Sequence, residues 1–153
     1  MNMRRLQPSE VLPLMEWIAD RHYLEGTPAG CVFALEFLDR RQRIGAMLLG
    51  TPTGPGLDDA ILQLSRMYFI DGTEHCIESQ ALAMMRKFIR TWYPRIRLLL
   101  SYSDPEQGHE GTIYAADGWA KFGMTRSGGK GWNSRHCRKS SQGWPKQRWV
   151  RTP

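Results

Sequence analysis

The sequence predicts an α/β (α+β) fold with a mixed, mostly antiparallel central sheet that helices flank. Two short apolar runs flank a charged turn early in the chain, which is the pattern of a β-hairpin. A strand-like run, an amphipathic helical run and the most apolar run of the chain then follow one another, as in a strand–helix–strand crossover. The 153 residues suffice for one hydrophobic core, so we expect a single domain over residues 1–153.

The first part of the chain is expected to form a helix and the hairpin. Apolar residues at near-helical spacing predict a helix from about Leu14 to Tyr23, because Pro13 interrupts the pattern before it. The hairpin strands are expected at Cys31–Leu38 and Ile44–Leu49. Two prolines and two glycines then make Thr51–Gly56 a predicted loop.

The crossover is expected in the middle of the chain. Ala60–Ile70 alternates like a strand, and the apolar residues of Ser79–Trp92 share one helical face. Arg95–Ser101 is the densest apolar run and predicts a central strand buried on both faces. The later elements are expected to be a short helix, two strands and an intervening stretch of long loops, at Gly108–Ala116, Trp119–Thr125, Gln147–Val150 and residues 127–143.

Composition favours a protein of the cytoplasm. No apolar run approaches the length that a membrane span needs, and the two N-terminal arginines are not followed by the apolar region of a signal peptide. The three cysteines are widely spaced and form no CxxC pair, which argues against a disulfide framework and a zinc ribbon. We therefore expect no membrane association and a reducing compartment.

The positive charge of the chain is concentrated in its C-terminal portion, residues 118–153. This portion carries nine Lys/Arg and no Asp/Glu, whereas residues 1–117 carry twelve Lys/Arg against fifteen Asp/Glu. Cations beside tryptophan rings are what a nucleic-acid surface needs, for phosphates and for an extruded base respectively. The alternative is a solvated basic surface with its tryptophans packed inward. The predicted DNA-binding residues are Lys130, Trp132, Arg135, Arg138, Lys139, Lys146, Arg148 and Trp149.

An unusual set of polar segments carries a family resemblance. The segments are residues 22–23 (HY), 64–69 (LSRMYF), 101–105 (SYSDP), 108–114 (GHEGTIY) and 146–149 (KQRW). Together they resemble the Mom family of phage proteins, from about residue 20 to the end of the chain. The resemblance implies a GNAT-like acyltransferase fold and transfer of a carbamoylmethyl group to the exocyclic amine of adenine in double-stranded DNA. A role in protecting phage DNA from restriction, in the cytoplasm of the host cell, is implied with it.

The resemblance also implies roles for individual residues. It assigns His22, Tyr23, Asp104 and Tyr114 to the active site, and Arg66 and Ser79 to the binding of a small-molecule donor. Imidazole, phenolate and carboxylate suit iron, so His22, Tyr23 and Asp104 are candidate metal ligands. The donor is left open between acetyl-CoA and another small molecule, and a homodimer is left open as well.

Each of these residues also has a purely structural interpretation. Asp104 follows the most buried strand, where open sheets bind ligands, but Asp-Pro also starts turns. Tyr114 has a hydroxyl for acid–base chemistry or serves as a core aromatic residue. Ser79 is equally a helix N-cap. For Arg66 the structural interpretation is a surface ion pair, which is less favoured because apolar residues surround it.

The loop before the predicted second helix argues against the usual way of binding coenzyme A. In ordinary members of this fold the loop is glycine-rich and presents backbone amides to the cofactor pyrophosphate. Residues 71–79 contain one glycine and three acidic residues instead, and their charges would oppose a pyrophosphate. We therefore weigh DNA adenine modification against two alternatives, an acetyl-CoA-dependent N-acetyltransferase and a non-catalytic DNA-binding module.

Overall fold

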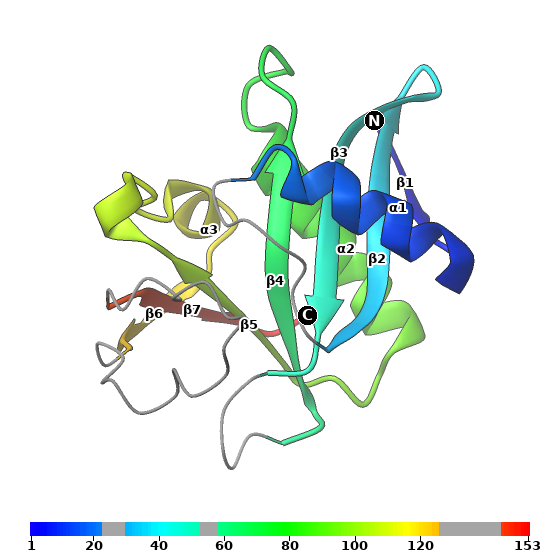
Figure 1. Ribbon diagram of the computed structural model, residues 1–153. Coiled ribbons are helices and arrows are strands. Elements are labelled where there is room, and N and C mark those ends of the chain that lie inside the picture. Colours follow the sequence, from blue (N-terminus) through cyan, green and yellow to red (C-terminus); the bar gives the residue numbers. More distant parts are fainter. Residues whose placement is uncertain (23–29, 53–57, 126–144) are drawn as a thin grey trace, which may run out of the picture.

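A computed structural model describes residues 1–22, 30–52, 58–125 and 145–153 of the chain. It contains one seven-stranded sheet in the order β1-β2-β3-β4-β5-β7-β6 (Figure 1). The strands are β1 (Asn2–Arg5), β2 (Cys31–Asp39), β3 (Gln42–Gly50), β4 (Ile61–Phe69), β5 (Leu98–Ser103), β6 (Ala120–Met124) and β7 (Gln147–Arg151). The helices are α1 (Pro8–Ala19), α2 (Ile77–Trp92), the 3₁₀ turn η1 (Pro105–Gln107) and α3 (Thr112–Ala116).

Five of the six strand pairings are antiparallel, and β4–β5 is the parallel one. Parallel neighbours need a crossover connection, and α2 provides it between β4 and β5. The predicted mixed, mostly antiparallel sheet with flanking helices is therefore confirmed. The predicted hairpin is confirmed too, because β2 and β3 pair from Cys31–Gly50 to Asp39–Gln42. None of the described helices is long and apolar enough to cross a membrane.

The N-terminal elements differ from the prediction. The first helix begins at Pro8 and ends at Ala19, with Pro13 inside it, whereas we predicted Leu14–Tyr23. Its start is stabilised by Glu10, whose carboxylate accepts the backbone N–H of Gln7 at 2.8 Å. Pro8 occupies the first helical position at no cost, because the N–H that a proline lacks would have no partner within the helix there.

Strand β1 was missing from the prediction. Its residues are polar or exposed for the most part, so they carry no apolar alternation. The strand pairs with β2 at the sheet edge, and Arg4 places its guanidinium 2.8 Å from the carboxylate of Glu36, which is only 4% exposed. Arg43 contacts the same carboxylate at 2.6 Å. The pairing of β1 with β2 therefore includes an ion pair between residues far apart in the sequence, which no local sequence pattern reveals.

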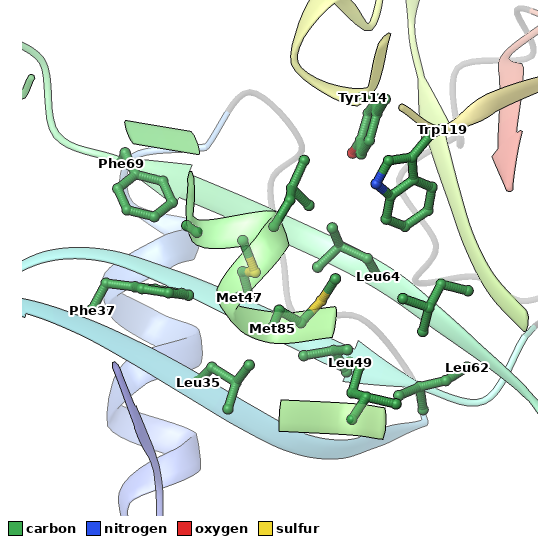
Figure 2. Packing of buried hydrophobic residues seen from close by; sticks show 14 of the residues in the cluster. Leu35, Phe37, Met47, Leu49, Leu62, Leu64, Phe69, Met85, Tyr114 and Trp119 are labelled. Atoms are coloured by element: carbon green, nitrogen blue, oxygen red, sulfur yellow. The ribbon is translucent and has the colours of Figure 1, made fainter. Parts of the chain in front are cut away.

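Two hydrophobic clusters cover the two faces of the sheet, and α1 and α2 lie on opposite sides of it (Figure 1). On the face that we call the α1 face, Leu14 and Ile18 pack on Leu48 of β3. On the other, the α2 face, Met85 packs among Leu35, Met47 and Leu49 (Figure 2). The faces are used below to say from which side each residue reaches the candidate site.

The helix predicted at Gly108–Ala116 is shorter and begins later. Gly108 and Gly111 both have positive φ, 75° and 80°, and they separate η1 from α3. A side chain at Gly111 would also meet the ring of Trp149, since a Cβ there would lie 2.4 Å from it. This glycine is needed both for its backbone conformation and for the close approach of the tryptophan.

A buried ion pair holds α2 to the end of α3. Arg86 donates two hydrogen bonds to Asp117, both 2.8 Å long, and the indole N–H of Trp119 donates to the same carboxylate at 2.9 Å. The side chain of Asp117 is 5% exposed, so its removal would leave a guanidinium and an indole N–H with poor access to water.

We predict that Asp117→Ala lowers the free energy of unfolding by about 3 kcal/mol, because it leaves a largely buried charge without its partner. Urea denaturation of the variant and of the wild type measures the difference. Glu106→Ala, at an exposed position of η1, serves as control and is expected to change stability by less than about 0.5 kcal/mol. A change of that small size in Asp117→Ala would contradict the role assigned to the pair.

Candidate active site

The candidate site lies where β4 and β5 part. The two strands pair through three residues only, ending at Gln63 opposite Leu100. Beyond this point β4 stays with β3 as far as Phe69, while β5 stays with β7. The strands begin side by side and lean apart along their length (Figure 1). The sheet is therefore split at the carboxyl ends of its two parallel strands, where open sheets accommodate ligands.

A cavity of about 920 Å³ occupies this split. Its lining comes from both faces of the sheet: Arg66 pairs with Leu48 and so belongs to the α1 face, whereas Leu64 pairs with Leu49 and belongs to the α2 face. The polar and charged residues that line it are Arg21, His22, Gln63, Ser65, Arg66, Tyr68, Asp71, Glu78, Ser101, Tyr102, Ser103, His109, Glu110, Thr112, Tyr114, Thr125 and Lys146. Residues of both faces of the sheet thus line one cavity.

Positive charge gathers around His22 in this cavity. His22 follows the last turn of α1, and its backbone N–H donates to the carbonyl oxygen of Ile18 at 2.7 Å. Burial, and after it the charges of Arg66, His109 and Lys146, together lower the pKa of His22 to about 4. His22 is therefore neutral at pH 7 and has a nitrogen that can accept a proton, in a field that attracts anions.

Asp104 lies directly after β5 and is fully buried, with no exposed surface. Neither of its carboxylate oxygens accepts a hydrogen bond from the residues that the structure describes, and its nearest cation is Lys146 at 3.9 Å. Ser103 and Lys146 line the cavity beside it. Asp104 precedes η1, as the turn interpretation expected, but its side chain does not cap that turn. The carboxylate is thus available to orient Lys146 in the cavity wall.

Tyr114 lines the cavity from the α2 face and is only 7% exposed. Its hydroxyl lies 2.7 Å from that of Ser101, which also donates to the carbonyl oxygen of Leu64 at 3.1 Å. Either hydroxyl can be the donor of this bond; when Ser101 gives its one proton to Leu64, the phenol donates to Ser101. The ring packs against Trp119 and Trp149, with centroids 5.3 and 5.7 Å away. The core interpretation and the active-site interpretation of Tyr114 are therefore compatible.

The two predicted donor-binding residues lie in different places. Arg66 lines the large cavity, whereas Ser79 lines a second cavity of about 400 Å³ at the start of α2. The two cavities share residues of the loop and of α3, among them Asp71, Glu78 and Thr112. Ser79 is not the N-cap, because α2 begins at Ile77 and the Ser79 hydroxyl donates to the carbonyl of Cys76 at 2.9 Å.

The second cavity does not fit a pyrophosphate. Asp71, Glu74 and Glu78 line it, and none of the Lys and Arg residues that the structure describes does. The N-cap residue Cys76 adopts a left-handed conformation, with φ of 65°, and its side chain accepts no hydrogen bond from the first turn of α2. Carboxylates at a helix N-terminus compete with a bound anion for the same backbone N–H groups.

The metal site stays a prediction. Two of its proposed ligands, His22 and Asp104, are described, whereas Tyr23 lies outside the described residues. Among the described residues no three His, Cys, Asp or Glu side chains are gathered as a metal site requires. The cations around His22 oppose a further positive ion there, so the donor set fits a metal poorly and no step below uses one.

The predicted DNA-binding residues divide into three groups. Five of them lie outside the described residues, namely Lys130, Trp132, Arg135, Arg138 and Lys139. Lys146 lines the large cavity, and Arg148 donates to the carbonyl of Met124 at 3.3 Å while lying over the ring of Phe122. Contact of these seven with DNA remains a prediction.

The prediction for Trp149 is wrong. This residue is 2% exposed, donates through its indole N–H to Ser103 at 2.9 Å and stacks on Tyr114. A ring enclosed in this way has no free face for a base. The central position of β7, between β5 and β6, buries it, and this position was not evident from the basic composition around it.

Two described residues that flank the basic segment 126–144, Thr125 and Lys146, lie at the cavity. The backbone N–H of Thr125 donates to the carbonyl of Lys146, and the N–H of Lys146 donates to the Thr125 hydroxyl, both at 2.8 Å. Both residues line the cavity. The segment that contains five predicted DNA-binding residues therefore leaves and re-enters the described structure at the cavity rim.

Sequence reasoning missed Gln63 and Ser101, and it assigned no task to His109. Ser101 was included as the end of a strand and as part of segment 101–105, without a role of its own, and Gln63 lies inside a strand-like run. Their signal was a polar residue interrupting a buried strand, since a buried polar group must find a partner in the protein or in a ligand.

Family comparison identifies the chain. The model of the Mom protein family matches residues 13–152. The chain belongs to the Mom protein family. No curated protein matches its sequence.

Solved structures place this Mom protein in the GNAT-like fold. It is similar to AAC(6')-Ib in complex with paromomycin and acetyl-CoA, at a TM-score of 0.70 and 11% identity, covering 99% of this chain and 92% of that one. It is also similar to a ribosomal-protein-alanine N-acetyltransferase from Brucella melitensis (0.68, 12%, all of both chains) and to the GNAT-like decarboxylase GphF in complex with isobutyryl-CoA (0.64, 17%, 99% of both). At identities this low, the structural similarity shows the fold alone.

We predict that the His22 imidazole of the metal-free protein titrates with a midpoint of about 4 in an NMR pH titration. The unfolded chain binds this proton at the ordinary value of 6.5, so the folded state loses stability as the pH falls from 6.5 towards 4. His22→Gln should lose less stability than the wild type over that range. A midpoint near 6.5 would show that the imidazole is neither desolvated nor close to these cations.

Proposed function

We propose that this Mom protein is a DNA-modifying transferase that attaches a carbamoylmethyl group to the exocyclic amine of adenine. The observation that carries the proposal is the cavity in the split of the sheet, which brings a proton acceptor, a phenol and cations to one place. An enzyme that modifies the amine of adenine must take the base out of the duplex and enclose it in a pocket. The cavity volume of about 920 Å³ is within the range for small-molecule sites.

The charges of the cavity support one direction for DNA. Arg66 and Lys146 provide a positive field around the neutral His22. Thr125 and Lys146, which flank the basic segment, line the same cavity. Asp71 and Glu78 line the part of the cavity that adjoins the start of α2 and would repel phosphates. In the proposal DNA approaches the cationic side and the donor occupies the opposite, α2-face side.

The proposed transfer needs one proton acceptor and one proton donor. The lone pair of the adenine amine forms a bond to the methylene carbon of the donor, whose bond to its leaving group breaks with its electron pair. The amine nitrogen, now carrying four bonds, is a strong acid, so a base as weak as His22 suffices to take its proton.

Tyr114 is the proposed proton donor to the leaving group. Its partner Ser101 is placed to rotate its hydroxyl from the Leu64 carbonyl towards the phenolate that results, and so to stabilise it. Asp104 acts as a positioning residue in the proposal, because its buried carboxylate lies 3.9 Å from the Lys146 ammonium and attracts it. The donor and its leaving group are not specified by these residues.

An N-acetyltransferase that uses acetyl-CoA is the second candidate, favoured by the acetyltransferases that share the fold. The acidic second cavity argues against it, since a coenzyme A pyrophosphate would face three carboxylates there. A non-catalytic DNA-binding module would leave the buried Asp104 carboxylate and the Ser101–Tyr114 pair without a task.

Nucleoside mass spectrometry of plasmid DNA from cells that express the protein tests the proposal. We expect a deoxyadenosine that is heavier by a carbamoylmethyl group, reduced about 100-fold in Tyr114→Phe and in His22→Gln. Tyr93→Phe, whose ring packs on Phe33 and Phe88 and is not among the described residues that line the cavity, is the matched control and should modify DNA as the wild type does. Unmodified DNA beside a folded wild-type protein would count against the transferase and in favour of the DNA-binding module.

A salt titration of DNA binding tests the role of the basic segment. We predict that the triple variant Arg135→Ala, Arg138→Ala, Lys139→Ala binds a duplex more weakly than the wild type. The slope of log K against log salt concentration should become shallower by about 2 to 3, since each phosphate contact contributes about 0.9. A triple variant on and beside α2 (Lys87→Ala, Arg90→Ala, Arg95→Ala) removes the same charge at exposed positions. Equal slopes for the two triple variants would refute a specific role for the segment.

A further inference from the structure

Gln63 occupies the closed end of the split. It is the last residue of β4 that has β5 as a neighbour, opposite Leu100, and on its other side it pairs with Gly50 of β3. The residues before and after it, Leu62 and Leu64, both belong to the α2-face cluster. Because successive side chains of a strand point to opposite faces, Gln63 points to the α1 face.

The carboxamide of Gln63 has a hydrogen-bond acceptor left over. Its Oε1 atom is buried and accepts no hydrogen bond from the part of the chain that the structure describes, although the residue lines the large cavity. A buried acceptor without a donor is costly, and native proteins seldom keep one without a reason. An N–H group of a ligand in the cavity would satisfy it.

The charges of the cavity indicate which ligand lies on that side. Arg66, which pairs with Leu48, is on the same α1 face, and its positive charge and that of Lys146 act on His22. Asp71 and Glu78 line the part of the cavity that adjoins the acidic second cavity. A nucleotide with its phosphate is attracted to the first group and repelled by the second. The ligand that meets Gln63 is then the base of an extruded nucleotide.

We propose that Gln63 reads the base as adenine, an inference that rests on the proposed function. A glutamine carboxamide matches the edge of adenine in two bonds: its oxygen accepts one N6–H and its nitrogen donates to N7. The second N6–H remains for removal by His22. Hypoxanthine, which has an oxygen in place of the N6 amine, would set two acceptors against each other. Gln63 thus acts as a specificity-determining residue and orients the nitrogen that forms the new bond.

Binding of short duplexes tests this inference without the donor. Each duplex has one purine opposite an abasic site, so that extrusion costs little. The purine is adenine, hypoxanthine or 7-deazaadenine, and fluorescence anisotropy gives the affinity. The wild type should bind the adenine duplex about tenfold more tightly than the hypoxanthine duplex, and also more tightly than the 7-deazaadenine duplex, because each analogue loses part of the bidentate pair.

Two substitutions separate base reading from packing. Gln63→Met keeps the volume but has no polar atoms, so it should bind all three duplexes equally. Gln63→Glu keeps an acceptor for N6–H and should retain part of the preference over hypoxanthine, with none over 7-deazaadenine. If Gln63 had a purely structural role, Gln63→Glu would impair the protein more than Gln63→Met, because methionine is easier to bury than a carboxylate. Gln80→Met, at an exposed position of α2, is the matched control and should bind as the wild type does.

The outcomes separate this inference from the proposed function. A wild type that binds the three duplexes equally, or a Gln63→Met variant that keeps the adenine preference, overturns base reading by Gln63. If that variant keeps the preference but stops modifying DNA in cells, Gln63 contacts the donor instead and the inference is likewise overturned. If the wild type prefers adenine but leaves cellular DNA unmodified, the transferase proposal fails while base reading by Gln63 is supported.

Discussion

The hydrogen bond from the Ser101 hydroxyl to the carbonyl oxygen of Leu64 is the interaction on which the site depends. Beyond Gln63 the β5-facing edge of β4 has lost its strand partner, and a backbone acceptor left there unpaired would be costly. The Ser101 hydroxyl donates to this acceptor from across the split at 3.1 Å. The same hydroxyl is hydrogen-bonded to that of Tyr114 at 2.7 Å. One side chain therefore stabilises the opening of the sheet and fixes the phenol that faces it.

The opening is kept in shape by a rigid wall. Trp149 of β7 and Trp119 hold the Tyr114 ring between them, and Gly111 allows the tryptophan of β7 to approach α3 closely. Removing the tyrosine hydroxyl alone would leave this packing in place, since the three rings bury mainly apolar surface. The chemistry of Tyr114 and its structural role therefore reside in different atoms of one residue, which is why a substitution to phenylalanine can separate them.

The sequence predicted those parts of the fold that have a local signal. The apolar runs and the amphipathic helix gave β2 to β5 and α2 within three residues of their observed ends. The edge strand β1 depends instead on pairs between separate segments, such as Arg4–Glu36, which no local pattern contains. The early start of α1 has a local cap in Glu10 and was missed because Pro13 interrupts the apolar pattern. For the site, polar residues at strand ends pointed to the correct region. The enclosure of Trp149 and the unmet acceptor of Gln63 follow from the strand order, which the sequence alone does not contain.

The acidic start of α2 limits what the donor can be in the proposed reaction. Acetyltransferases with this fold were solved with acetyl-CoA, a large ligand with its own pyrophosphate. Here Asp71, Glu74 and Glu78 surround the corresponding helix end, so little binding energy is available for such a group. The affinity for the donor must then come from the split itself, where the lining provides several hydroxyls. A donor held there has to be small, because the extruded base shares the same cavity. In the proposed reaction, therefore, the fold is retained without its usual cofactor.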